Sequence, residues 1–279
     1  MRRSLVVPVL AAASALPLLL SCETAEKIMD VVTPFLISDQ QEYEMGNNFY
    51  SQIVADSVSY RLYKKNAQVV SYIRGIGSSV VAHQTDRPEV SDTFEYNFDV
   101  IDNDTVVNAF AIPGGHVFVY TGLLLNASNE AEVAGVISHE VSHITKRHGA
   151  QKLVESYGID FCMDLIFGDS TALRSAMDIA TGMLFLKFSR ENEYEADSSG
   201  LSYMINCGYN PTGMVTFFQS LQDSGGTPKV FEAFSTHPNT ADRIAAVNTM
   251  ISGNSSANLS DTALYASRFA PIKTILQND

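Results

Sequence analysis

Basic residues, cysteines and long hydrophobic runs are all scarce in this chain of 279 residues. Its 18 Lys and Arg residues face 31 Asp and Glu residues, which gives a formal net charge of −13 at pH 7. Such an acidic chain is not expected to bind nucleic acid, because phosphates attract basic surfaces. No repeat period is present, which argues against a helical-repeat array.

The one long apolar run, from Leu5 to Leu20, follows two arginines at the amino terminus. It has the charged start, apolar middle and small-residue end of an export signal, and it is shorter than the roughly 20 residues that span a membrane. Its ending, Leu19-Leu20-Ser21-Cys22, resembles a bacterial lipobox. Residues 1–21 are therefore expected to be a signal peptide that is removed before Cys22 receives lipid. An export signal without lipidation is the alternative.

Lipidation predicts a place in the bacterial cell envelope, with the chain anchored to a membrane and facing the periplasm. Glu23, not Asp, follows Cys22, which by analogy with enteric bacteria permits sorting to the outer membrane. The remaining cysteines, Cys162 and Cys207, can pair outside the cytoplasm. A disulfide between them would close a loop of about 45 residues and contribute about 3 to 4 kcal/mol on a chain-entropy model. We expect this bridge, with two buried thiols as the alternative.

The segment His139-Glu140-Val141-Ser142-His143 is the most informative part of the sequence. Residues four apart share one face of a helix, so both imidazoles can reach the same ion. Zinc binds neutral imidazole, and a catalytic zinc site keeps one position open for water beside three protein ligands. Glu140 is placed to remove a proton from that water. The pattern predicts a zinc-dependent peptidase.

The residues around this motif have the pattern of a helix. Asn129 can cap its amino end, with Glu132 three residues later in a capping-box spacing. Gly135 lies one turn before His139 and leaves room on that face. An apolar stripe follows the helical period at Val133, Val136, Ile137, Val141 and Ile144. An ordinary amphipathic helix that carries two histidines is the alternative.

A third ligand must come from another segment. A metzincin would continue into a Gly and a third His, but Lys146 and Gly149 stand at those positions. His148 is expected on a different part of the helix face, either in solvent or behind the ligands. Further on, Glu193 and Asp197 are one turn apart, so one carboxylate can bind metal while the other accepts a hydrogen bond from a ligand imidazole. A solvated acidic helix face is the alternative.

With these segments the chain resembles the gluzincin metallopeptidases of the HtpX, BepA and LoiP kind, and most of all their small periplasmic lipoprotein members. Three further stretches match that family's pattern: Ser38 to Gly46, Asn108 to Leu124, and Ser235-Thr236-His237-Pro238 followed by Arg243-Ile244. The resemblance covers roughly residues 38 to 251. It is specific, because separated motifs occur in the family's order.

The resemblance implies His139, His143 and Glu193 as the ligands of one Zn²⁺ per chain and Glu140 as the general base. It implies Asp197 as the carboxylate that holds a ligand imidazole from behind.

Two later residues also gain roles from the resemblance. In this family the His of the Ser-Thr-His-Pro segment, here His237, lies near the metal and can act as an additional ligand, which would close the open position and hold the enzyme latent. A structural residue at a helix start, before Pro238, is the alternative. Arg243 can stabilise the oxyanion of the transition state, or it can pair with surface carboxylates.

The chain as a whole predicts an α+β fold, in which a mostly helical gluzincin metallopeptidase domain carries a small β-sheet ahead of the zinc helix. Residues 22–37 are expected to be a lipid-anchored linker, 38–251 the peptidase domain, and 252–279 a C-terminal tail. Helical patterns precede the sheet at Ser38 into the fifties and at Asn66 to His83. A period-two pattern follows at Phe94 to Val100, and segments rich in β-forming residues follow at Thr105 to Ile112 and His116 to Thr121.

Two segments are expected to border the cleft in which the peptidase would bind its substrate. Ile179 to Phe188 predicts a buried helix that lines it. In gluzincins the strand nearest the cleft holds substrate in extended form by main-chain hydrogen bonds, and His116 to Tyr120 is the candidate. An ordinary core strand is the alternative for this second segment.

Three functions fit the sequence. The first is an endopeptidase that cuts misfolded or unassembled envelope proteins, as the resemblance implies. The second is a chaperone-like factor that works with outer-membrane assembly machinery and cleaves clients as a secondary outcome. The third is a zinc-binding lipoprotein without turnover, but a binder gains nothing from Glu140 beside the metal. Polypeptide substrates and a membrane, reached through the lipid anchor, are the expected partners.

Overall fold

The computed structural model describes residues 36–166, 187–223, 237 and 240–279. The expected signal peptide, Cys22 and most of the expected helix at Ile179 to Phe188 lie outside the described residues. Residues Asp39–Asp279 form one unit by their internal contacts. None of the helices in the described ranges combines the length and apolar character that a membrane span requires.

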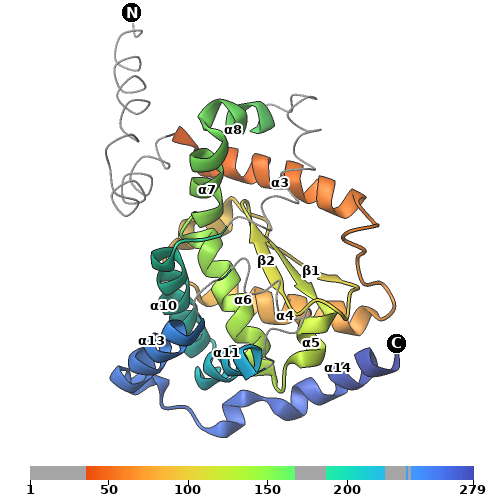
Figure 1. The fold of residues 1–279 in the computed structure, drawn as a ribbon, viewed down its shortest axis with the longest axis vertical. Helices are drawn as coiled ribbons and strands as arrows, with labels where there is room; N and C mark the ends of the chain where they lie inside the picture. Colours follow the sequence, from red (N-terminus) through yellow and green to blue (C-terminus); the bar gives the residue numbers. More distant parts are fainter. Residues whose placement is uncertain (1–35, 167–186, 224–236, 238–239) are drawn as a thin grey trace, which may run out of the picture. The chain divides into compact units, whose positions relative to one another are not determined.

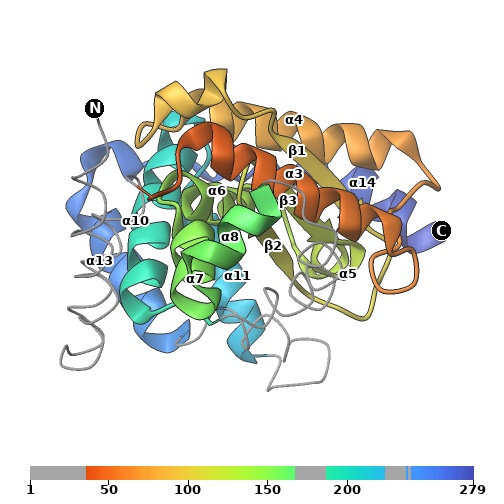
Figure 2. The same ribbon diagram turned by 90° about the horizontal axis from the view of Figure 1, so that it is seen from above.

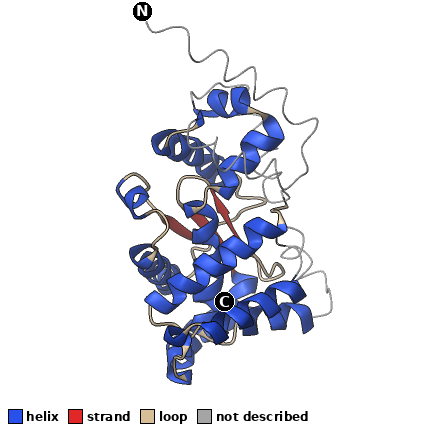
Figure 3. Ribbon diagram, turned by 90° about the vertical axis from the view of Figure 1, so that its left-hand side faces the viewer, coloured by secondary structure: helices blue, strands red, loops and turns tan. Residues whose placement is uncertain are grey.

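Helices dominate the described chain, and the sheet is small (Figure 3). The expected α+β class is therefore confirmed. In chain order the α-helices are α3 (Asp39–Ala55), α4 (Ala67–His83), α5 (Thr121–Asn126), α6 (Glu130–Thr145), α7 (His148–Tyr157), α8 (Ile159–Ile166), α10 (Arg190–Asn206), α11 (Thr212–Asp223), α13 (Thr240–Gly253) and α14 (Ala266–Asn278). Short 3₁₀ turns lie at Pro88–Asp92, Ser255–Ala257 and Asp261–Leu264.

The sheet has the strand order β1-β3-β2, so β3 is central. Strand β1 (Asn97–Ile101) runs parallel to β3 (His116–Tyr120), and β2 (Ala109–Ile112) runs antiparallel to it. The β2–β3 turn contains Gly114 and Gly115 with φ of 82° and 100°, a region that residues with a Cβ rarely adopt. Because β3 is paired on both sides and fully buried, our expectation that it binds substrate is wrong, and it is a core strand.

Helix α6 lies between the sheet and α10 (Figure 1). Its amino end is capped as predicted, because the Asn129 side chain accepts a hydrogen bond from the Glu132 N–H at 3.0 Å, and the Glu132 carboxylate accepts one from the Ser128 N–H at 2.8 Å. Every residue of α6 except Val136 is buried. The motif histidines thus lie on a helix that is surrounded by other elements.

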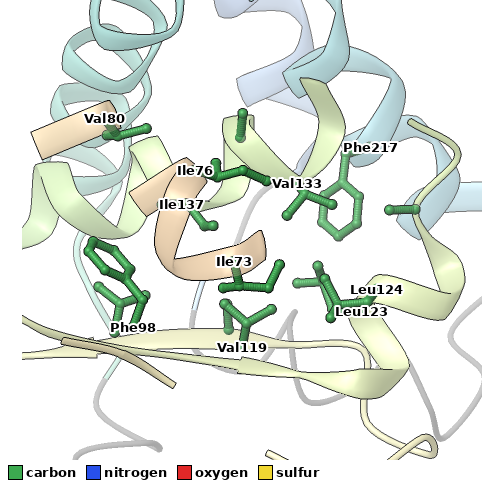
Figure 4. Packing of buried hydrophobic residues seen from close by; sticks show 14 of the residues in the cluster. Ile73, Ile76, Val80, Phe98, Val119, Leu123, Leu124, Val133, Ile137 and Phe217 are labelled. Carbon is green, nitrogen blue, oxygen red and sulfur yellow. The ribbon is translucent and has the colours of Figure 1, made fainter. Parts of the chain in front are cut away.

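Helix α4 fills the space between the sheet and α6 with apolar side chains (Figure 4). Ile73 and Ile76 of α4 are 0% and 4% exposed, and Val119 of β3 and Ile137 of α6 are 0% exposed. On another side of the unit, α8 packs against α3 (Figure 2). Burial of apolar area on both faces of α6 fixes its position, since each fully buried aliphatic side chain contributes roughly 1.5 to 3 kcal/mol.

The segment after residue 251 carries helix α14, whose Phe269, Ile272 and Leu276 belong to the main hydrophobic cluster. Arg268 of this helix binds both carboxylate oxygens of Glu130, the first residue of α6. Tyr209 donates a further hydrogen bond to Glu130 at 2.8 Å. The residues that we expected to form a tail therefore contact the start of the metal-motif helix.

Both described cysteines are free thiols, so the expected disulfide is wrong. Cys162 lies buried in α8, whereas Cys207 follows α10 and its thiol donates to the Ser79 carbonyl of α4 at 3.4 Å. Burial raises the pKa of Cys162 to about 12, which keeps that thiol protonated and unreactive.

Candidate metal centre

Four side chains from three parts of the chain meet beside α6. His139 and His143 come from α6, Glu193 from the first turn of α10, and His237 from the segment ahead of α13. One donor atom of each lies within 4.8 Å of the others. The Nε2 atoms of His139 and His143 are 3.0 Å apart, and Glu193 oxygens lie 3.6 Å and 3.7 Å from them.

This arrangement fits zinc. Zinc bonds of about 2.0 to 2.2 Å in a tetrahedral site place neighbouring donors roughly 3.3 to 3.5 Å apart, close to the distances between His139, His143 and Glu193. Burial, together with the neighbouring His139 and His148, holds the pKa of His143 well below its usual range. The ring is therefore neutral and has a lone pair available for a metal. Two imidazoles with one carboxylate are a donor set that catalytic zinc uses.

Helix α10 presents Glu193 and Asp197 to α6. Ser189 caps the helix through reciprocal hydrogen bonds with Asn192, at 3.0 Å and 3.3 Å. The two carboxylates lie one turn apart and are 1% and 0% exposed. The solvated acidic face that we considered is thus wrong for these residues. Burial opposes ionisation of Glu193, but the charges of His237 and Arg243 outweigh it and hold its pKa below the usual range.

Asp197 lies behind the first histidine. One of its oxygens is 2.9 Å from Nδ1 of His139, and both oxygens accept hydrogen bonds from Arg243 at 2.7 Å. Burial would raise the pKa of Asp197, but Arg243 and His139 outweigh it and hold the pKa at about 2. The carboxylate is therefore ionised, and it can fix the ring of His139 with Nε2 facing the cluster.

Arg243, from α13, joins Asp197 to the cluster. Its guanidinium lies 2.6 Å from Glu193, and its central carbon lies 4.5 Å from the ring centre of Phe218. The residue is 3% exposed, and its carboxylate partners are buried, which differs from the surface pairing that we considered. It also borders the hollow beside His139 and Glu140, so the structure brings it to the edge of the site.

Glu140 is buried next to the cluster and faces the sheet. Its carboxylate accepts a hydrogen bond from the backbone N–H of Ala111, and burial raises its pKa despite nearby histidines. Since Ala111 lies in β2, the edge of β2 that is not paired with β3 faces Glu140. A hollow beside Glu140 is lined by apolar side chains, among them Val107, Val136, Phe217, Phe218 and Leu221.

His237 lies over the cluster between two carboxylates. Its Nδ1 is 2.8 Å from Glu193, its Nε2 is 3.5 Å from Glu140, and its side chain is 12% exposed. Burial would lower its pKa, but the two carboxylates outweigh that effect and raise it. Helix α13 begins three residues later, at Thr240. The side chain is thus close enough to act on the cluster.

The sequence left His148 either in solvent or behind the ligands, and the structure places it behind His143. Its ring is 2% exposed, and its Nδ1 lies 2.8 Å from Nδ1 of His143. Arg147 adopts a left-handed conformation, with φ of 63°, which ends α6 and starts α7 at His148. Phe188 also lies against His143, with ring centres 4.1 Å apart. No local signal in the sequence indicates the left-handed Arg147.

The comparisons with known proteins agree with this geometry. A family model described as Peptidase family M48 matches residues 55–251. The chain belongs to this family. The matched region contains the four clustered residues together with Glu140 and Arg243. The resemblance to peptidases of the HtpX and BepA kind is therefore confirmed.

Several curated relatives in this family are similar to the chain. The beta-barrel assembly-enhancing protease of Escherichia coli K12 is 28% identical over 221 residues, which cover 75% of this chain and 43% of that protein. The mitochondrial metalloendopeptidase OMA1 of Arabidopsis thaliana is 36% identical over 49% of the chain and 28% of its own length. Metalloprotease YcaL of Escherichia coli K12 is 34% identical over 49% of the chain and 55% of its own length. The chain thus spans less than half the length of the first of these relatives.

Proposed function

We propose that this chain is a zinc-dependent endopeptidase, with His139, His143 and Glu193 as the zinc ligands and Glu140 as the general base. The observation that carries the proposal is the buried carboxylate of Glu140 beside a cluster whose donors fit zinc. A protein that only stored zinc would have no use for this carboxylate.

The side chains divide the chemistry among them. Bound zinc supplies a Lewis acid that lowers the pKa of water to about 7. Glu140 takes the proton of the attacking water and passes it to the leaving amine. Its pKa, raised by burial, brings the proton affinity of the carboxylate nearer to neutral pH, where a general base is most effective. Asp197 and Arg243 hold His139 and Glu193 in place, and Arg243 would stabilise the developing oxyanion.

The edge strand β2 indicates where a peptide substrate would bind. An extended peptide would add to the edge of β2 that pairs with no other strand among the described residues, next to Glu140, with main-chain hydrogen bonds in place of a fourth strand. The hollow formed by Val136, Phe217 and Phe218 would accept an apolar side chain of that peptide. His237, between Glu140 and Glu193, would hold the enzyme latent as an additional ligand or stabilise the transition state.

Replacement of Glu140 by Gln tests the proposal. Glu140→Gln keeps the shape of the side chain but removes the base, so casein cleavage should fall by at least about 100-fold while zinc content stays at one per chain. The casein assay is run with and without a zinc chelator. Wild-type cleavage that resists the chelator, or full turnover by the variant, would refute the proposal.

The cellular role is also a proposal. We place the chain in the bacterial envelope as a lipoprotein anchored through Cys22, where it would cut misfolded or unassembled proteins. The name of the beta-barrel assembly-enhancing protease supports a second candidate, a factor that holds outer-membrane clients during assembly. Clients trapped by Glu140→Gln in intact cells would favour this second role, whereas loss of trapping together with cleavage would favour proteolysis alone.

A further inference from the structure

We infer that His148 and Glu195 form a hydrogen-bonded chain that orients His143 as a metal ligand and fixes which of its ring nitrogens carries the proton. The inference rests on the proposed zinc function. It assigns positioning roles to two residues that lie outside the ligand cluster.

The hydrogen-bonded chain runs from the metal cluster to the protein surface. Nδ1 of His143 lies 2.8 Å from Nδ1 of His148, and Nε2 of His148 lies 3.2 Å from Oε2 of Glu195. His143 and His148 are both 2% exposed, whereas the Glu195 side chain is 45% exposed. A buried ligand is thus connected through one buried ring to a carboxylate in water.

Metal binding sets the direction of both hydrogen bonds that link His143, His148 and Glu195. Nε2 of His143 faces the cluster, so a metal would take its lone pair and leave the proton of the neutral ring on Nδ1. The Nδ1–H group of His143 must then donate a hydrogen bond to Nδ1 of His148, so that His148 carries its own proton on Nε2. The carboxylate of Glu195 accepts the hydrogen bond that this Nε2–H group donates. The arrangement extends the common carboxylate–histidine–zinc unit by one imidazole.

The backbone is shaped to place His148 in this position. A continuous α6 would carry residue 148 away from residue 143, but the left-handed Arg147 turns the chain back. A left-handed residue with a Cβ costs roughly 1 to 2 kcal/mol. Here Nε of Arg147 lies 2.7 Å from the buried carboxylate of Glu42, which holds the turn.

Two other contacts have different effects. Phe188 stacks on His143 with an interplanar angle of 22°, which sets the plane of the ring but not its rotation within that plane. Lys146 lies 3.1 Å from Glu195, and this partly exposed ion pair contributes only about 0 to 1 kcal/mol. A large effect of Glu195 on metal binding would therefore have to pass through His148.

The test compares zinc affinity, measured by competition with a chelating dye, among four variants of the full chain. His148→Phe removes the acceptor, and Glu195→Gln removes the carboxylate. Each should weaken zinc binding about 10- to 100-fold, the usual cost of losing a partner behind a ligand. His148→Gln offers an amide oxygen to His143 and should recover part of the affinity. Glu191→Gln removes the same charge from an exposed position of the same helix and should bind as wild type.

Nitrogen NMR of the zinc-loaded wild type gives a second readout, and His148 should carry its proton on Nε2. A proton on Nδ1 of His148 would overturn the inference, as would zinc affinities of folded His148→Phe and Glu195→Gln within twofold of wild type. If His148→Phe does not fold, the zinc affinity of Glu195→Gln and the position of the His148 proton in the NMR spectrum still test the inference. Wild type that binds no zinc would instead refute the proposed function, so the two failures can be told apart.

Discussion

His116 is a buried histidine that belongs to the sheet and not to the metal centre. It is 0% exposed, stacks on Tyr50 with ring centres 4.5 Å apart, and lies 3.2 Å from the Asn97 amide through Nδ1. Its Nε2 has no hydrogen-bond partner among the described residues. Burial lowers the pKa of His116 from 6.5 to about 4.

This histidine should make the unfolding free energy depend on pH. Between about pH 6.5 and 4 the unfolded chain binds a proton at His116 that the folded chain does not, so the unfolding free energy falls as pH falls through this window. The contribution is about 3 kcal/mol at full extent. His116→Phe should remove this part of the pH dependence, as measured by urea unfolding at pH 7, 5.5 and 4.

His83 is exposed, so His83→Gln is the matched control for the loss of a histidine. The same pH dependence in His116→Phe as in wild type would contradict the assignment.

Spacing alone was informative for some residues of the centre and not for others. His139 with His143, and Glu193 with Asp197, are four residues apart on helices, so their common faces follow from helix geometry. His148 could not be predicted in the same way. Its place depends on the left-handed Arg147 and on Glu42 of α3, a contact between distant parts of the chain.

At the scale of elements, the close contact of α10 with α6 sets the geometry of the centre. A Cβ on Gly200 of α10 would lie 3.0 Å from the backbone nitrogen of His139. The contact brings Glu193, two turns earlier on α10, towards the histidines. A larger side chain at residue 200 must push the two helices apart.

Gly200→Val should therefore lower both stability and zinc affinity. Overpacking of this kind costs about 1 to 3 kcal/mol of unfolding free energy, and displacement of Glu193 should weaken zinc binding at least about tenfold. Gly75→Val is the matched control, because a Cβ there has no atom within 4 Å, and it should keep wild-type zinc affinity. Equal zinc affinity of the two variants would show that the helix contact does not position Glu193.

Element types followed from local pattern, whereas strand order did not. The cap at Asn129 and the apolar period located α6, and the period-two segments located the strands. Both β2 and β3 carry similar apolar residues, so their sequences do not say which is central. The pairing of β1 with β3 decides it, and this pairing joins strands that are separated in the sequence by β2.

For the molecule as a whole, a bound metal would join α6, α10 and the segment before α13. Ligand binding to the folded state alone stabilises it by about 2.7 kcal/mol when free ligand is 100 times the Kd. For a unit of this size, Tm rises by roughly 2 to 4 °C for each kcal/mol added to the unfolding free energy. The Tm should therefore rise by about 5 to 10 °C when the metal-free protein receives zinc.

Differential scanning fluorimetry measures this shift. Magnesium is the control ion and should leave Tm unchanged, because it prefers oxygen ligands to imidazole. No shift with zinc at concentrations that saturate the dye-competition assay would contradict a metal site that joins these elements.

The order of the centre's residues along the chain has a consequence for biosynthesis. His139 interacts with His237 and Arg243, which are 98 and 104 residues further on. A ribosome adds residues in numerical order, so a nascent chain holds both motif histidines well before Glu193 and Arg243 exist. The four clustered side chains can therefore come together only after residue 237 has been added, which is late in the synthesis of the chain.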